Sequence, residues 1–207
     1  ILSGGQAVVE SFKANNVKNV FGLIGSATME LFDALYDTND IRFIGVRDER
    51  TGTHMADGYA RATGQPGIII AGQNGPGATN LITGVAQANA AFSPVISLAG
   101  AIATEHVGKD AFQEIDQHAL FETITKKTWS IKQTNKIPRI LNEAFNLALT
   151  PRCVPVHINL PRDILANSDS FAKFKKFQKA TMPEVSKEDI SKAIDIILLS
   201  SQPVIIA

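Results

Sequence analysis

The chain has 207 residues, enough to bury one sizeable core, or one domain and the beginning of a second. Lysine and arginine number 20, as do aspartate and glutamate, so no net charge favours nucleic acid, an anionic membrane or a polyanionic substrate. Cys153 is the only cysteine, which excludes an intrachain disulfide and a thiolate metal cluster and suits a reducing compartment. We expect a cytoplasmic protein that binds a small-molecule substrate and further copies of itself, but no nucleic acid and no membrane.

Strand-like and helix-like segments alternate from Gly5 to Leu160. Short β-branched runs predict buried strands at Asn19 to Gly22, Arg42 to Val46, Gly67 to Ala71, Val95 to Ala99, Lys127 to Ile131 and Pro155 to Leu160. Stretches with helical spacing predict helices at Gln6 to Asn15, Thr28 to Tyr36, Glu49 to Thr63, Ala78 to Asn89 and Ile137 to Leu149. The alternation predicts an α/β fold with three layers, a doubly wound and mainly parallel sheet with helices on both faces.

A glycine-rich segment, Gly72 to Gly77, follows the third predicted strand and opens the helix at Ala78. Backbone amides at such a turn commonly meet a ligand. A Walker A loop would need lysine where Ala78 stands, and a dinucleotide fingerprint would need a small residue where Asn80 stands. Both nucleotide motifs therefore fail, and the spacing alone fits either a ligand site or a plain tight turn.

The composition changes after Arg162. Residues 168–177 are basic, polar and aromatic without a clean period, as in a linker that tucks its phenylalanines onto its own domain. Ser186 can cap a helix running to about Leu199, and residues 203–207 begin like a buried strand. We predict a domain over 1–164, a linker over 165–185 and the start of a truncated central domain over 186–207. Residues after Asp163 should pack loosely.

Five motifs, in register, resemble thiamine-diphosphate-dependent enzymes of the acetolactate synthase group. They lie at Phe21 to Ala27, Arg47 to Arg61, Asn74 to Asn80, Asp110 to Glu114 and Asn159 to Asp163. The resemblance implies the pyrimidine-binding domain of a carboligase or lyase that forms a C2 carbanion on its cofactor and transfers a two-carbon unit. The alternative is a non-catalytic ligand-binding or structural module that retains the same fold.

Three departures from the usual acetolactate synthase pattern bear on the subgroup. Ile24 to Ala27 stands where that group has a Pro-Gly-Gly turn, Asp48 replaces a histidine, and Gln73-Asn74 replaces the serine before Gly-Pro-Gly. These features, together with the segments Phe112 to Gln117 and Pro161 to Asp163, look more like sulfoacetaldehyde acetyltransferase. Gly77 to Leu81 and Asp110 to Phe112 are also at home in acetolactate synthases. Both transferase activities therefore stay open.

The resemblance assigns the activating carboxylate to Glu49. Thiamine chemistry needs the aminopyrimidine held in its imino form, which a carboxylic acid bonded to ring atom N1′ achieves. Glu49 lies just past the carboxyl end of a predicted strand, where open α/β sheets place ligands. By position alone it also fits an acidic first-turn residue stabilised by the helix dipole. A catalytic Glu49 should be buried.

Other site residues follow from the same resemblance. Residues implied at the thiamine diphosphate are Gly25, Ser26, Ala27, Glu49, Pro76 and Asn80, while Phe112 and Gln113 would lie on the substrate side, Gln113 as a second catalytic residue. No metal site is predicted here, because the family binds diphosphate and Mg²⁺ through a Gly-Asp-Gly motif that this sequence lacks.

That missing motif has consequences for assembly. The Mg²⁺ would be bound by a domain absent from this chain, supplied by a neighbouring subunit. The resemblance therefore implies a homodimer or homotetramer, paired through exposed apolar faces of helices 49–63 and 78–89. The chain alone is expected to be inactive, and FAD is possible in the full-length enzyme, since some relatives bind it.

Overall fold

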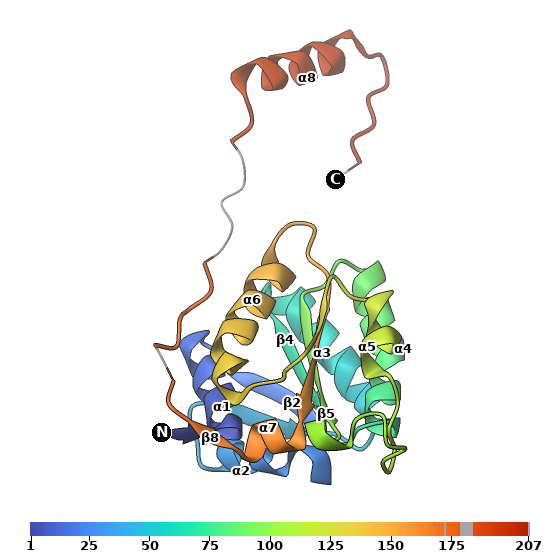
Figure 1. The fold of residues 1–207 in the computed structure, drawn as a ribbon. Coiled ribbons are helices and arrows are strands. Elements are labelled where there is room, and N and C mark those ends of the chain that lie inside the picture. Colours follow the sequence, from blue (N-terminus) through green and yellow to red (C-terminus); the bar gives the residue numbers. More distant parts are fainter. Residues whose placement is uncertain (172, 179–183, 207) are drawn as a thin grey trace.

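A six-stranded parallel sheet forms the centre of the computed structural model, which describes residues 1–171, 173–178 and 184–206 (Figure 1). Its strands are β2 (Asn19–Leu23), β3 (Arg42–Gly45), β4 (Gly67–Ala71), β5 (Val95–Ala101), β6 (Thr128–Ser130) and β7 (Val156–Pro161). They lie in the order β3-β2-β4-β5-β7-β6, and every neighbouring pair is parallel. The predicted strands are confirmed, with ends that differ by at most two residues.

Helices cover both faces of the sheet. The first face carries α1 (Gly4–Ala14), α2 (Met29–Tyr36), α6 (Ile137–Leu149) and α7 (Arg162–Ala166), and the second carries α3 (Glu49–Thr63), α4 (Pro76–Ala90) and α5 (Gln117–Glu122). Along β4, Ile68 and Ile70 enter the first core, whereas Ile69 and Ala71 enter the second. Each isoleucine buried in this way contributes about 1.5–3 kcal/mol. The predicted three-layer fold is therefore confirmed.

Local chemistry sets the ends of the helices. Ser3 caps α1 in a capping box, in which its hydroxyl accepts from the Gln6 amide and the Gln6 side chain accepts from the Ser3 amide. Gly64, with φ of 67°, ends α3 in the left-handed conformation that favours glycine. The sequence does not predict α5 or α7, because helices of six and five residues span less than two turns and show no apolar period. Short 3₁₀ turns complete the body at η1 (Ser26–Thr28), η2 (Thr104–His106) and η3 (Thr134–Lys136).

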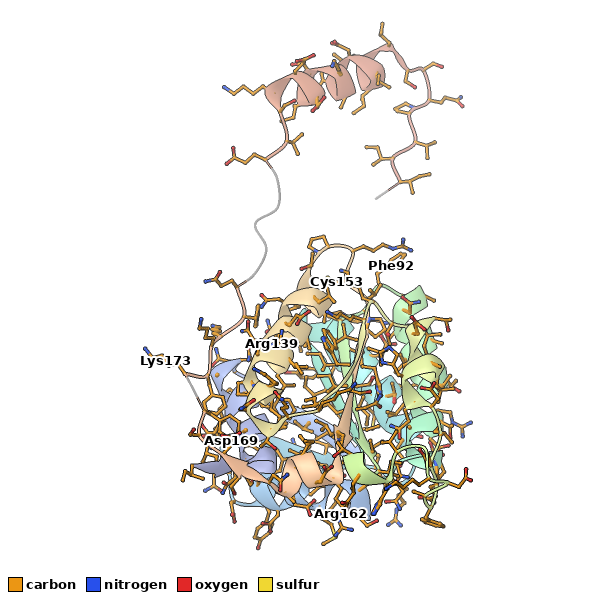
Figure 2. All side chains as sticks on the ribbon, viewed as in Figure 1. Phe92, Arg139, Cys153, Arg162, Asp169 and Lys173 are labelled. Atoms are coloured by element: carbon orange, nitrogen blue, oxygen red, sulfur yellow. The ribbon has the colours of Figure 1, made fainter. Side chains whose placement is uncertain are left out.

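The residues after Asp163 do not pack loosely. Leu165 is fully buried, and β8 (Ser168–Asp169) pairs antiparallel with β1 (Leu2–Ser3). Figure 2 shows Asp169 and Lys173 along the side of the body. Three phenylalanines of this segment pack against the first core, as the sequence predicts: Phe171, Phe174 and Phe177. The expectation of loose packing is wrong for residues 164–171 and 173–178, because removing the three phenylalanine rings from water against the core stabilises the packed position of this segment.

Beyond that anchored segment lies α8 (Lys187–Leu199), of which no residue is buried. Its predicted cap is confirmed, since the Ser186 hydroxyl accepts from the Asp189 amide at 3.0 Å. Residues 203–206, expected to begin a strand, form none in the structure as described. Ala172 and residues 179–183 of the predicted linker, and Ala207 of the predicted strand, lie outside the described residues.

The exposed faces of α3 and α4 differ from the expectation. Met55, with 39% of its surface exposed, is the only large apolar side chain among the exposed positions of the two helices. Their other large apolar side chains already pack in the second core, and the two helices touch each other closely, since a Cβ on Gly84 of α4 would lie 2.5 Å from Thr53 of α3. The predicted apolar faces are therefore wrong.

Within the described ranges, no helix has both the length and the apolar character that crossing a membrane requires.

A buried polar network connects β5, β7 and α5. His157 has no exposed surface, and its ring stacks on Phe121 with centroids 3.4 Å apart. Its Nδ1 lies 2.8 Å from the Ser97 hydroxyl, and its Nε2 lies 2.9 Å from Oδ1 of Asn159. Burial lowers the pKa of His157 to about 3. The imidazole is therefore neutral in the folded protein at physiological pH.

Acid should destabilise the fold through His157. Its pKa is about 3 in the folded protein against an ordinary value of 6.5, so below pH 6.5 the unfolded chain binds a proton that the folded chain does not. The stabilisation is complete above pH 6.5, and the free energy of unfolding should fall by roughly 1.4 kcal/mol per pH unit as the pH drops towards 3. Urea unfolding between pH 6 and 4 should show this slope in the wild type and a shallower one in His157→Gln. The exposed His118→Gln serves as the control, and equal slopes in all three proteins would contradict the assignment.

Candidate functional site

The direction in which the sheet is wound changes between β2 and β4. β3 lies on one side of β2 and β4 on the other, and the helices that follow β2 and β4 cover opposite faces. Open α/β sheets bind ligands outside the carboxyl ends of their strands at such a point. In Figure 2, Arg162, directly after β7, marks this end of the sheet, and Phe92 and Cys153 mark the other end.

Glu49 lies at this edge, at the first position of α3. Only 4% of its surface is exposed, so the burial expected of it is found. The Asn80 side-chain amide, from α4, donates to Oε2 of Glu49 at 3.0 Å. A Cβ on Gly77 would lie 3.2 Å from Oε1, so glycine keeps the space beside this oxygen clear. One oxygen of this buried side chain is hydrogen-bonded to Asn80, and the other lies beside Gly77, where no side chain blocks it. The second oxygen can therefore exchange a proton with a ligand nitrogen.

Two turns meet next to this carboxylate. A Cβ on Gly25, after β2, would lie 2.5 Å from the Gly72 carbonyl oxygen, after β4. The Ala27 amide donates to that same carbonyl at 3.1 Å, and the Ser26 hydroxyl donates to the Gln73 side chain at 3.0 Å. The turn at residues 25–27 and the glycine-rich turn at residues 72–77 therefore form one continuous surface.

A third segment, the loop of residues 102–116, touches the glycine-rich turn. The Asn74 side-chain amide donates to the carbonyl oxygens of Phe112 and Gln113, each at 3.0 Å. Gly75 has φ of 56°, and a Cβ there would lie 2.5 Å from the Gln113 carbonyl oxygen. Phe112 is 81% exposed, whereas Oε1 of Gln113 is buried without a hydrogen-bond partner among the described residues. A buried acceptor left unpaired is unfavourable, so this atom suits a donor from a ligand.

The same loop is ordered internally by Glu114. Its carboxylate oxygens accept from the backbone amides of Gly108 at 2.6 Å and Ala111 at 3.0 Å. These backbone hydrogen bonds lower the pKa of Glu114. A cavity of about 870 Å³ lies beside the loop, lined in part by Val107, Glu114 and, from β7, Asn159.

The structure therefore brings most of the predicted site residues together. Glu49 and Asn80 are in contact, Gly25, Ser26 and Ala27 adjoin the glycine-rich turn, and Phe112 and Gln113 reach that turn through Asn74. Pro76 begins α4 and is exposed. The sequence does not single out Asn74, Glu114 or Asp163, although these side chains hold the loop of residues 102–116 by hydrogen bonds. The only local signal for Asn74 is its place directly before Gly75, because asparagine followed by glycine is typical of a turn.

Known proteins are similar to this chain in sequence and in fold. The family model described as thiamine pyrophosphate enzyme, N-terminal TPP binding domain, matches residues 2–120. The chain is 41% identical over 212 residues to a probable acetolactate synthase large subunit of Methanocaldococcus jannaschii, covering 100% of this chain and 36% of that protein. It is 37% identical to the acetolactate synthase isozyme 3 large subunit of Escherichia coli, covering 99% of this chain and 36% of that protein.

Among solved structures, a thiamine diphosphate-dependent 4-hydroxybenzoylformate decarboxylase of Rhodococcus jostii superposes with a TM-score of 0.89. The match covers 98% of this chain and 38% of that chain at 21% sequence identity, which shows a shared fold. The chain spans about a third of the length of these curated relatives, 36% in both cases.

Proposed function

The chain belongs to the thiamine pyrophosphate enzyme family through its N-terminal TPP-binding domain, and from this we propose that it is the pyrimidine-binding part of a longer, catalytically active transferase. The observation that carries the proposal is the buried carboxylate of Glu49 at the point where the sheet reverses its winding. Burial of an ionisable side chain is costly, and a module that merely kept the fold would have no need to bury Glu49 beside Gly77, where no side chain fills the space. Thiamine diphosphate would supply, when bound, a nucleophilic carbon that adds to a substrate carbonyl and a ring that accepts the electron pair of the carbon–carbon bond that then breaks.

Each site residue then has a definable task. Glu49 would bond the pyrimidine ring and exchange a proton with its N1′ atom, while Asn80 holds the other carboxylate oxygen in place. Gly25, Ser26, Ala27 and Pro76 would contact the cofactor, because they line the turns beside Glu49. Gln113 would act on the substrate side, where its unpaired side-chain oxygen can accept a hydrogen bond.

The substrate we propose is pyruvate. The two relatives are named as acetolactate synthases, and acetolactate forms when two pyruvate anions and one proton give one acetolactate anion and one CO₂. The second candidate is a sulfoacetaldehyde acetyltransferase activity, favoured by Ser26-Ala27, Asp48 and Asn74 at positions where acetolactate synthases usually differ.

Substrate choice can be tested with the full-length protein, thiamine diphosphate and Mg²⁺, with and without FAD. Pyruvate alone should yield acetolactate and CO₂ in equal amounts, and leaving out thiamine diphosphate should abolish the reaction. Conversion of sulfoacetaldehyde and added inorganic phosphate to acetyl phosphate and sulfite, without conversion of pyruvate, would support the second activity. Conversion of neither substrate, with normal cofactor binding, would favour the non-catalytic module.

We further propose that the full-length protein is at least a dimer, with the diphosphate and Mg²⁺ held by a part of the enzyme beyond residues 1–207. Large apolar side chains flank the site and are exposed: Ile24 at 63%, Met29 at 53% and Phe112 at 81%. Exposed apolar surface beside a site is typical of a face that another domain or subunit covers. Light scattering of the full-length protein should give at least twice the mass of one chain, and a monomer with full activity would contradict the assembly.

A further inference from the structure

The loop of residues 102–116 has little support from the core. The cavity of about 870 Å³ lies beside it, and Val107 and Phe112 are 63% and 81% exposed. A segment with so few buried apolar contacts does not hold its shape by packing. Hydrogen bonds, both within the loop and from the rest of the chain, must therefore set the position of Phe112 and Gln113.

The two ends of the loop are bonded to the end of β7. The Thr104 amide donates to Oδ1 of Asp163 at 3.0 Å, just beyond that strand. Just past the other end of the loop, Nε2 of Gln117 donates to Oδ1 of Asn159 at 2.9 Å. The motif at residues 159–163 therefore anchors the base of the loop. Neither of these two hydrogen bonds involves the backbone of Phe112 or Gln113.

Asn74 makes that connection at the tip of the loop. It is 7% exposed, and its single amide group bonds both carbonyl oxygens, of Phe112 and of Gln113. The backbones touch at the same place, where a Cβ on Gly75 would lie 2.5 Å from the Gln113 carbonyl. Gln113 has φ of 60°, a left-handed conformation that persists in a non-glycine residue only where its surroundings enforce it.

We propose that Asn74 is a positioning residue that sets how Phe112 and Gln113 face the substrate, and thereby influences which acceptor carbonyl compound is used. This inference rests on the proposed function, since it takes Phe112 and Gln113 to lie on the substrate side. Glu49 receives its hydrogen bond from Asn80 and not from Asn74. Activation of the cofactor and choice of acceptor should therefore respond differently to changes at residue 74.

The experiment uses Asn74→Asp in the full-length holoenzyme. Aspartate has nearly the same shape, but its carboxylate only accepts hydrogen bonds, so both bonds to the loop are lost. Hydrogen–deuterium exchange at C2 of thiamine diphosphate should stay within about threefold of wild type. The kcat/KM for pyruvate should fall by about 10- to 100-fold, the scale of a small misplacement of reacting groups. The ratio of products from competing pyruvate and 2-oxobutyrate should change as well.

Asn146→Asp is the matched control. The Asn146 side chain also donates to a backbone carbonyl, that of Asn142 at 2.8 Å, but it lies on α6, and its carbonyl oxygen accepts from Gln178 at 3.0 Å. Both readouts should remain at wild-type values there. Asn74→Ala removes the same two bonds without adding a charge and should shift the product ratio in the same direction.

The outcomes separate the two levels of inference. Absence of C2 exchange in the wild-type holoenzyme would overturn the proposed function itself. Normal exchange with an unchanged product ratio in both residue-74 variants would overturn the positioning role and leave the proposed function intact. An equal loss of exchange and turnover in both variants, with a lower melting temperature, would reduce Asn74 to a structural residue and also overturn the inference.

Discussion

Glu49→Gln in the full-length protein should bind thiamine diphosphate and Mg²⁺ with wild-type affinity and lose at least about 100-fold in turnover. C2 hydrogen–deuterium exchange should fall by the same factor. Glutamine keeps the size of the side chain and can still be bonded by Asn80, but it cannot exchange a proton with a ring nitrogen. Affinity should survive, because the proposed diphosphate and metal contacts lie in another part of the enzyme.

Glu10→Gln provides the control for this measurement. Glu10 is a partly exposed carboxylate of α1 that forms an ion pair with Lys13 of the same helix. Because α1 lies on the face of the sheet opposite to Glu49, removal of the Glu10 charge should leave C2 exchange and turnover unchanged. Glu49→Ala should be no more active than Glu49→Gln. Wild-type exchange in Glu49→Gln with normal cofactor binding would show that Glu49 is only a helix-start acid, and the proposed function would lose its central residue.

Gly72→Ala should lower the free energy of unfolding of the 207-residue chain by about 3 kcal/mol, the upper part of the range for overpacking. A Cβ at this position would lie 2.2 Å from the Gly25 nitrogen and 2.3 Å from the Leu23 carbonyl oxygen. Both atoms belong to the backbone, so relief requires that the turn after β2 move away from the turn after β4. Urea or thermal unfolding measures the change.

Gly58→Ala is the matched glycine variant. No atom lies within 4 Å of a Cβ at Gly58, which sits inside α3. The added methyl group should stabilise the helix by about 0.5–1 kcal/mol, because alanine has the higher helix propensity. If the two variants changed stability equally, the close contact between the turns at Gly25 and Gly72 would be refuted.

Local signals explain why much of the fold could be predicted. Gly67 to Ala71 is a short apolar run after a proline, and it is a fully buried strand in the structure. The helix from Glu49 to Thr63 starts after the cap at Asp48 and ends at Gly64, so the residues next to it determine both of its ends. The order of such segments then fixes a parallel sheet and places Glu49 at a carboxyl end.

The rest depends on contacts between distant parts of the chain. Asn74 bonds residues 38 and 39 positions away, and no local pattern reports such a bond. The loop of residues 102–116 has neither a helical nor a strand period, and its conformation comes from Asp163, Glu114 and Asn74. The sequence predicts that the phenylalanines after residue 170 pack on the body. It does not predict the pairing of β1 with β8 that fixes the start of this segment, because strands of two residues show no pattern.

The pairing of β1 with β8 also bears on how the protein folds during synthesis. Leu2 pairs with Asp169 and Ser3 with Ser168, and the Gly4 amide donates to the Asn167 carbonyl at 3.0 Å. A Cβ on Gly4 would lie 2.1 Å from the Ile164 carbonyl, so the start of α1 fits against a segment that leaves the ribosome much later. The capping box can form early from nearby residues, whereas docking of α1 against residues 164–169 needs contacts between distant parts of the chain. The first turn of α1 therefore lacks its packing partner until residue 169 has left the ribosome.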